Sequence, residues 1–131
     1  MLSNDQASLR GAKFLVVDDD PSSLTLLELI VTSFEGEALT AIEIETAKAI
    51  FTEARPQLVI SDIAMPKEDG ISFIRWIRSL SPESGGQVPA VAVTEKVYET
   101  NRQQVLQAGF NEYLEKPVAI DALINAITAL L

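Results

Sequence analysis

Residues 13–36 read KFLVVDDDPSSLTLLELIVTSFEG, and this stretch decides the fold. Its first five residues are almost all apolar and stop abruptly at three aspartates, as a short buried strand does. Asp20 and Pro21 then signal a helix start, with aspartate as the N-cap and proline in the first turn. A stripe at helical spacing follows, made of Leu24, Leu27, Val31 and Phe34. The stretch therefore predicts one strand followed by one helix.

The same pattern of an apolar run followed by a helical stripe occurs four more times. We expect the further strands at 38–42, 58–60, 88–93 and 112–114, and the further helices at 47–54, 70–80, 98–108 and 120–131. Because the apolar runs do not alternate with polar residues, the strands should be buried on both faces, as in a parallel sheet covered by helices. We therefore predict a single doubly wound α/β domain with a five-stranded parallel sheet and right-handed crossovers.

The segments outside these elements are polar or rich in turn-forming residues. Residues 1–11 show no periodicity and are expected to form a tail or linker before a domain that spans 12–131. Residues 81–87, SPESGGQ, are expected to form a mobile surface loop. We assign Trp76 to packing, and Met65, Pro66 and Gly70 to shaping the loop that contains them.

Composition narrows the function before any motif is considered. The 131 residues include no cysteine and no histidine, which excludes thiolate chemistry, zinc-thiolate sites and a histidine general base. A formal net charge of −9 disfavours binding to nucleic acid or to an anionic membrane. The first residues resemble no signal peptide, and no apolar run approaches the roughly 20 residues of a membrane helix. We expect a cytoplasmic protein.

Polar side chains follow four of the five predicted strands. Asp18 and Asp19 follow the first strand, Asp62 the third, Thr94 the fourth and Lys116 the fifth. In open parallel sheets these strand ends lie at one edge, where ligands bind. Three carboxylates in a small space repel one another and favour a hard, oxygen-binding cation such as Mg²⁺. Together with a lysine and a hydroxyl, they suit a phosphoryl group, and a carboxylate nucleophile suggests an aspartyl phosphate.

The motifs around these strand ends resemble the receiver domains of two-component response regulators. They are VVDDD at 16–20, SDIAMPKEDG at 61–70, VT at 93–94 and YLEKP at 113–117. The resemblance runs from about Lys13 to the C-terminus. It implies a flavodoxin-like (βα)5 fold with strand order 2-1-3-4-5, an order that is known for chemotaxis receivers.

The resemblance also implies a role for each site residue. Asp62 is expected to accept the phosphoryl group, from a phosphohistidine on a histidine kinase or a phosphotransfer protein. Asp19, Asp62 and the backbone carbonyl of Ala64 are expected to bind Mg²⁺ or Mn²⁺, with Asp18 acting mainly through metal-bound water. Such a domain catalyses only its own phosphorylation and dephosphorylation.

Further implied roles concern the switch that follows phosphorylation. Lys116 is expected to pair with Asp62 and then with the phosphoryl oxygens, and to precede a cis peptide bond to Pro117. Thr94 is expected to bind the phosphoryl group and, with Tyr113, to signal its presence to a downstream protein or a fused output domain. The chain is expected to be a standalone receiver or part of a hybrid kinase or multidomain regulator.

One residue departs from the family pattern, and two other functions stay open. The residue after the conserved hydroxyl is usually Ala or Gly, but here it is Glu95, whose backbone N–H can still face the phosphoryl group. A phosphorylation-independent pseudo-receiver that only binds proteins is one alternative. The other is a phosphatase of the haloacid-dehalogenase type, because Asp18-x-Asp20 after a strand resembles that family's opening motif. Such enzymes need a further acidic pair near the fourth strand, where this chain has Thr94-Glu95.

Overall fold

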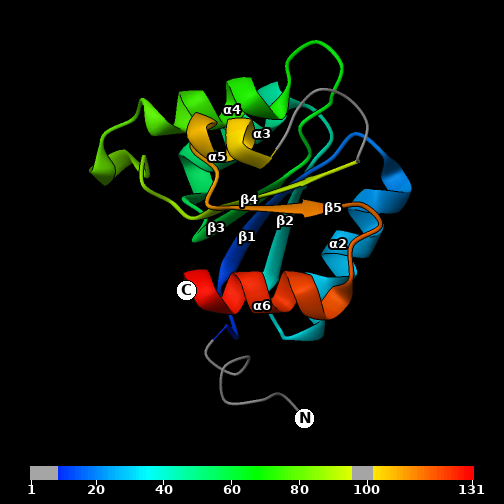
Figure 1. Ribbon diagram of the computed structural model, residues 1–131. Helices are drawn as coiled ribbons and strands as arrows, with labels where there is room; N and C mark the ends of the chain where they lie inside the picture. Colours follow the sequence, from blue (N-terminus) through cyan, green and yellow to red (C-terminus); the bar gives the residue numbers. More distant parts are fainter. Residues whose placement is uncertain (1–8, 96–101) are drawn as a thin grey trace.

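The computed structural model describes residues 9–95 and 102–131. The elements, in chain order, are β1 (Lys13–Val17), α2 (Pro21–Ser33), β2 (Glu37–Ala41), α3 (Ile44–Ala54), β3 (Leu58–Ser61), α4 (Gly70–Arg78), the 3-10 helix η1 (Pro82–Ser84), β4 (Ala90–Thr94), α5 (Arg102–Ala108), β5 (Glu112–Glu115) and α6 (Ile120–Leu130). The strands form one five-stranded parallel sheet in the order β2-β1-β3-β4-β5. Helices α2 and α6 cover one face, and α3, α4 and α5 cover the other (Figure 1). The predicted flavodoxin-like fold is confirmed.

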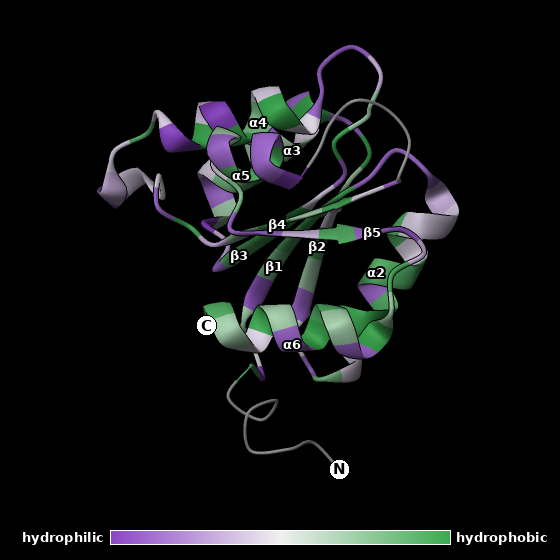
Figure 2. Ribbon diagram, in the orientation of Figure 1, coloured by the Kyte–Doolittle hydropathy of each residue, from purple (hydrophilic) through white to green (hydrophobic). Residues whose placement is uncertain are grey.

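The central strands are buried on both faces, which is why they are apolar without alternation. Every residue of β3 and β4 is buried. In β1, Leu15 and Val17 pack into the cluster beneath α3 and α4, whereas Phe14 and Val16 pack into the cluster beneath α2 and α6. Figure 2 shows these apolar strands enclosed between the two helical layers. Burial of this surface supplies the main favourable term in folding.

Aspartate side chains cap the starts of α2 and α4. The Asp20 side chain accepts a hydrogen bond from the Ser22 N–H at 3.3 Å, and Pro21 occupies the first turn of α2, as predicted. Asp69 caps α4 in the same way, accepting from the Ser72 N–H at 2.9 Å. The caps fix where α2 and α4 leave the edge of the sheet that carries the strand ends.

Several boundaries differ from the sequence prediction. The strand predicted from residue 88 begins at Ala90, since Pro89 has no N–H to donate to a neighbouring strand. Residues 82–84 form η1 inside the segment that was predicted to be a mobile loop. The first part of the helix predicted at 98–108 lies outside the described residues, and its described part is α5.

Packing contacts of the described chain begin at Leu9 and Arg10, within the segment expected to be a tail or linker. Leu9 is 1% exposed and packs with the α2–α6 cluster, and the Arg10 side chain lies 2.6 Å from Glu35. The boundary between tail and domain at residue 12 stays a prediction. None of the helices that the structure describes has the length and apolar character needed to cross a membrane.

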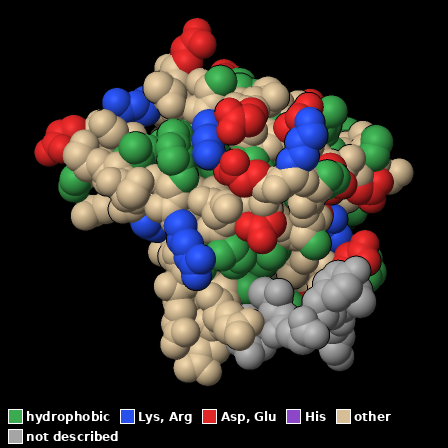
Figure 3. Space-filling model, turned by 90° about the horizontal axis from the view of Figure 1, so that it is seen from above, with side chains coloured by type: hydrophobic (Ala, Val, Ile, Leu, Met, Phe, Trp, Pro, Cys, Tyr) green, Lys and Arg blue, Asp and Glu red, His purple; other side chains and the backbone are tan. Residues whose placement is uncertain are grey.

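The outer surface of the α3–α4 layer carries charges of both signs. Figure 3, a view from above Figure 1, shows acidic and basic side chains interspersed on this face. One ion pair joins α3 to the loop before α4, with Lys48 Nζ 2.7 Å from Glu68. Lys48 also lies 5.6 Å from the centroid of the Trp76 ring. Trp76 packs against Phe51 and Phe73, as its assignment to packing predicted.

Candidate functional site

The carboxyl ends of the strands surround a cavity of about 270 Å³. Because β1, β3, β4 and β5 are parallel, the residues that follow them meet at one edge of the sheet. The cavity is lined by Asp19, Asp20, Asp62, Ala64, Thr94, Glu95 and Lys116. All the predicted site residues except Asp18 and Tyr113 therefore line one space, and Asp18 lies fully buried beside it.

Asp62 is held from both sides of its carboxylate. Its backbone N–H donates to the Val17 carbonyl at 2.8 Å, which fixes it to the end of β1. One carboxylate oxygen accepts from the Ile63 N–H at 2.7 Å, and the other accepts from Lys116 Nζ at 3.1 Å. Burial raises the pKa of Asp62 above its ordinary value, which outweighs the lowering effect of Lys116. The carboxylate is thus oriented but only partly neutralised.

Lys116 binds two carboxylates rather than one. Its Nζ lies 2.8 Å from Asp18 Oδ2 and 3.1 Å from Asp62 Oδ2. Burial by itself lowers the pKa of Lys116, but the hydrogen bonds and charges of Asp18 and Asp62 outweigh it and hold the pKa above the ordinary value. The backbone is fixed as well, because the Lys116 N–H donates to the Thr94 carbonyl at 2.9 Å. The peptide bond to Pro117 is cis, as expected.

The neighbouring aspartates Asp18 and Asp19 have different surroundings. Asp18 is completely buried, and one of its oxygens accepts from the Asp20 N–H at 2.9 Å. Its other oxygen accepts from the Ser23 hydroxyl at 2.6 Å as well as from Lys116. Asp19 is exposed and forms no hydrogen bond or ion pair within residues 9–95 and 102–131. The free carboxylate of Asp19 is therefore better placed than Asp18 to bind a cation directly.

The carboxylates of Asp18, Asp19 and Asp62 fit a metal ion. Each offers an oxygen, and these three oxygens lie within 4.8 Å of one another. A single ammonium, that of Lys116, faces the three negative charges within the described part of the cluster. An all-oxygen donor set with room for retained water suits Mg²⁺ or Mn²⁺. The donor set therefore supports the expected ion.

The remaining predicted residues divide between the cavity and the core. Thr94 is 6% exposed and lines the cavity at the end of β4. Ala64 lines it from the loop after β3, and Glu95 from the segment after β4. Tyr113 does not line the cavity; it is half-buried and packs against the α3–α4 cluster.

The comparison with protein families agrees with this geometry. Residues 14–128 match the family described as the response regulator receiver domain. The chain belongs to the response-regulator receiver family. The match includes every site residue given above and all five strands apart from Lys13, the first residue of β1.

Relatives of this receiver include both short and longer proteins. It is 41% identical over 121 residues to an uncharacterized 14.6 kDa protein in the sodA1 3' region of Leptolyngbya boryana, covering 92% of this chain and 90% of that protein. It is 34% identical over 119 residues to the transcriptional regulatory protein PrrA of Mycobacterium leprae, covering 91% of this chain but 49% of PrrA. The receiver thus spans about half the length of PrrA.

A solved structure gives a likeness in three dimensions. This is the receiver domain of sensor histidine kinase PA1611 from Pseudomonas aeruginosa PAO1, which has a magnesium ion coordinated in its active site cleft. The two chains are 29% identical and superpose with a TM-score of 0.82, covering 92% of this receiver and 97% of the other.

Two features of the site were missed from the sequence. The first is Ser23, whose hydroxyl donates to Asp18. The feature of the sequence that could have predicted this contact is the position of Ser23 one helical turn after the acidic run. A serine at such a position is common for other reasons. The second is how tightly Gly70 approaches the site. A Cβ on Gly70 would lie 2.1 Å from the Asp62 carbonyl oxygen, so only glycine fits. The expected structural role of Gly70 thus has a steric cause.

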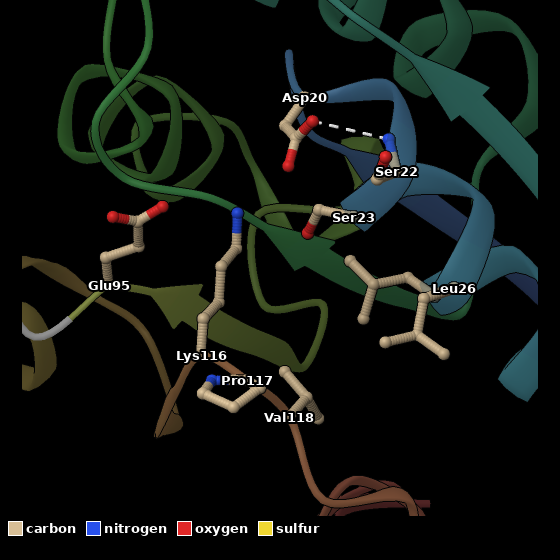
Figure 4. Close-up of a pocket in the computed structure, with 9 residues that line it drawn as sticks. Asp20, Ser22, Ser23, Leu26, Glu95, Lys116, Pro117 and Val118 are labelled. Atoms are coloured by element: carbon tan, nitrogen blue, oxygen red, sulfur yellow. Dashed lines mark hydrogen bonds between the residues drawn. The ribbon is translucent and has the colours of Figure 1, made fainter.

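A second cavity, of about 540 Å³, adjoins the first. Asp20, Glu95 and Lys116 line both cavities. The second one continues between the start of α2 and the segment after β5, where Ser22, Ser23, Leu26, Leu27, Pro117 and Val118 line it (Figure 4). The site therefore opens onto a larger space with an apolar wall.

Proposed function

We propose that this receiver accepts a phosphoryl group on Asp62 from a phosphohistidine of a partner protein, and that phosphorylation switches a protein-binding surface. One observation carries the proposal: the Asp62 carboxylate lines the cavity with Lys116 Nζ 3.1 Å away and the free carboxylate of Asp19 in the same cluster. A nucleophile, a fixed cation and a metal-binding group in one cavity are the parts that phosphoryl transfer to a carboxylate needs.

In the proposed reaction, a carboxylate oxygen of Asp62 attacks phosphorus. A P–O bond to the carboxylate forms as the P–N bond breaks, and the imidazole nitrogen keeps the electron pair. Lys116 offsets negative charge beside the acceptor, and the Thr94 hydroxyl with the Glu95 N–H donates to phosphoryl oxygens. Asp19, Asp62 and the Ala64 carbonyl would hold Mg²⁺ or Mn²⁺, and Asp18 would act through water. When bound, this ion supplies positive charge that stabilises the transferred group.

The relatives support the choice of ion and the type of partner. The PA1611 receiver coordinates magnesium in its active site cleft, and it is part of a sensor histidine kinase. PrrA is a transcriptional regulator about twice as long as the matched region. We propose a histidine kinase or phosphotransfer protein as the donor, a downstream protein or an attached output domain as the target, and the cytoplasm as the location. The receiver acts only on itself and does not turn over a separate substrate.

Intact mass spectrometry tests this function. The protein is incubated with phosphoramidate, with and without Mg²⁺, and we expect a mass gain of one phosphoryl group only with the ion. Asp62→Asn keeps the shape of the side chain but removes the nucleophilic charge, so its mass should not change. Asp69→Asn, which alters a carboxylate at the N-cap of α4, is the matched control and should still be labelled. Labelling of Asp62→Asn at the same rate as the unchanged protein would place the acceptor elsewhere.

Glu95 is the feature that favours one alternative function, a pseudo-receiver that binds partners without phosphorylation. Its carboxylate adds a negative charge to the wall of the cavity that receives the phosphoryl group. If no donor labels the unchanged protein at saturating Mg²⁺, this pseudo-receiver alternative is favoured. Sustained release of phosphate from a phosphomonoester would instead favour a phosphatase.

A further inference from the structure

Glu95 occupies the boundary between the two cavities. It directly follows the last residue of β4, and it lines both the cavity that holds Asp62 and the larger space beside α2. In Figure 4 the side chains of Glu95 and Lys116 extend toward the same end of the pocket. A phosphodonor bound at Asp62 therefore lies in a cavity whose wall includes Glu95.

No described residue neutralises the charge of Glu95, and the adjacent Lys96 lies outside the described residues. Within residues 9–95 and 102–131, Glu95 forms no hydrogen bond or ion pair. Among the described residues that line the cavity, Lys116 is the cation, and it is already bound to Asp18 and Asp62. Asp19 and Asp20 line the same cavity and add to the negative potential. The negative potential acts on the net charge of an approaching donor. Its strength falls with distance and is reduced by salt.

Phosphodonors differ in this net charge. Acyl phosphates such as acetyl phosphate are dianions at neutral pH. Donors with a P–N bond, such as phosphoramidate or a protonated phosphohistidine, carry a cationic nitrogen that offsets one negative charge.

We infer that Glu95 is a selectivity residue that disfavours dianionic acyl phosphates and favours donors with a cationic P–N group. The inference rests on the proposed function and names the donor class for the same site. It also explains how a receiver can tolerate an acidic side chain here, since a phosphohistidine donor presents its positive charge to Glu95 as it approaches.

The two donor reactions have the same acceptor and different leaving groups. With acetyl phosphate, the P–O bond to acetate breaks as the P–O bond to Asp62 forms, and acetate leaves as an anion. With phosphoramidate, the P–N bond breaks and ammonia leaves as a neutral molecule, because its nitrogen already carries three protons. Both reactions yield the same aspartyl phosphate, so a difference between them reports on the donor.

The test compares initial rates of mass gain with the two donors at saturating Mg²⁺ and low salt. Glu95→Gln keeps the size of the side chain and removes its charge. We expect its rate with acetyl phosphate to rise about tenfold, the factor that corresponds to about 1.4 kcal/mol. The rate with phosphoramidate should change much less. At about 1 M salt, where charges are screened within a few ångströms, the two donors should respond alike.

Glu53→Gln is the matched control. It also removes one exposed carboxylate, but from the far end of α3, at the opposite edge of the sheet. It should leave the ratio of the two rates unchanged, which separates a local effect of Glu95 from a change in net charge. At low salt, an equal change in the rates with both donors on Glu95→Gln, or no change in either rate, would overturn the inference and leave the proposed function standing. If neither donor labels the unchanged protein, the proposed function fails and the inference fails with it.

Discussion

Two polar clusters lie at opposite edges of the sheet and are built in opposite ways. The acceptor cluster, at the carboxyl ends of the strands, consists of Asp18, Asp19, Asp62 and Lys116. The Arg78 anchor, near the amino ends of β4 and β5, consists of Arg78 with the Gly86 carbonyl, the Gly109 carbonyl and Asn111. In the anchor, Arg78 donates to these three groups at 2.9, 3.0 and 3.1 Å, and Asn111 Oδ1 also accepts from the Ala90 N–H at 2.8 Å.

The difference lies in how donors and acceptors are balanced. The Arg78 anchor pairs one cation with neutral oxygens that need donors, so it holds α4 to the loops before β4 and β5 and is complete in itself. The acceptor cluster has three carboxylates and one ammonium in its described part, so it gains stability when a further cation binds. Fully paired polar groups stabilise the fold, whereas an excess of one charge favours binding of a ligand of opposite charge.

The largest effect that we expect comes from the anchor. Arg78→Ala removes donors from two backbone carbonyls and from Asn111, so the free energy of unfolding should fall by about 3 kcal/mol. Urea unfolding measures this change. Arg75→Ala, on the exposed side of α4, is the control and should change the free energy by less than about 0.5 kcal/mol. If both variants lose the same stability, the anchor has no special role.

The acceptor cluster should respond to Mg²⁺ instead. At about 100 times its dissociation constant, Mg²⁺ should raise the free energy of unfolding by about 2.7 kcal/mol. Asp19→Ala should raise the midpoint of metal-free unfolding, because it relieves repulsion, and should abolish the shift with Mg²⁺. Arg78→Ala should keep the whole shift, since the two clusters lie at different edges. A full Mg²⁺ response in Asp19→Ala would show that Asp19 is not a ligand.

A smaller effect should come from the hydroxyl that holds Asp18. Ser23→Ala removes the donor 2.6 Å from Asp18 Oδ2, while Lys116 and the Asp20 N–H remain, so the loss should be about 1 kcal/mol. Ser22→Ala is the matched control, because the Ser22 hydroxyl forms no hydrogen bond within residues 9–95 and 102–131. Equal urea midpoints for the two variants would remove Ser23 from the cluster.

The smallest effect that we expect is a dependence on pH. Because burial raises the pKa of Asp62, the folded protein binds this proton more tightly than the unfolded chain does. Ionised Asp62 therefore costs stability above its raised pKa, and the cost disappears as the pH falls through that value toward the unfolded one. Metal-free Asp62→Asn should be more stable than the unchanged protein at pH 7, and its advantage should shrink on acidification. An advantage that grows instead would contradict the raised pKa.

The fold could be predicted because its signals are local. Each strand is a short apolar run that stops at a polar residue, and Asp20-Pro21 marks a helix start within two residues. The misplaced boundary at Pro89 reflects a run that stays apolar although its proline cannot donate to the sheet. The 3-10 helix at 82–84 was missed because the same turn-forming residues are found in many irregular loops.

The prediction of the site was limited to the residues that directly follow a strand. Parallel strands bring Asp19, Asp62 and Lys116 to one edge, whatever else the chain does. The pairing of Lys116 with Asp18 as well as with Asp62 was not predicted, because it depends on side-chain positions across the sheet. The Arg78 anchor was not predicted for the same reason. Gly109 and Asn111 lie far along the chain from α4, and the sequence around a helical arginine does not indicate which groups it binds.

Trp76 gives this molecule a built-in optical probe. It is the only tryptophan in the sequence, so the emission spectrum of the protein reports on one place. That place is coupled to the loop after Asp62, because Glu68 in this loop binds Lys48, and Lys48 lies over the indole ring. A charge held near an indole shifts its emission, so a displacement of Glu68 that moves Lys48 becomes visible as a change in colour or intensity. Movement of the loop can thus be followed in real time without attaching a dye.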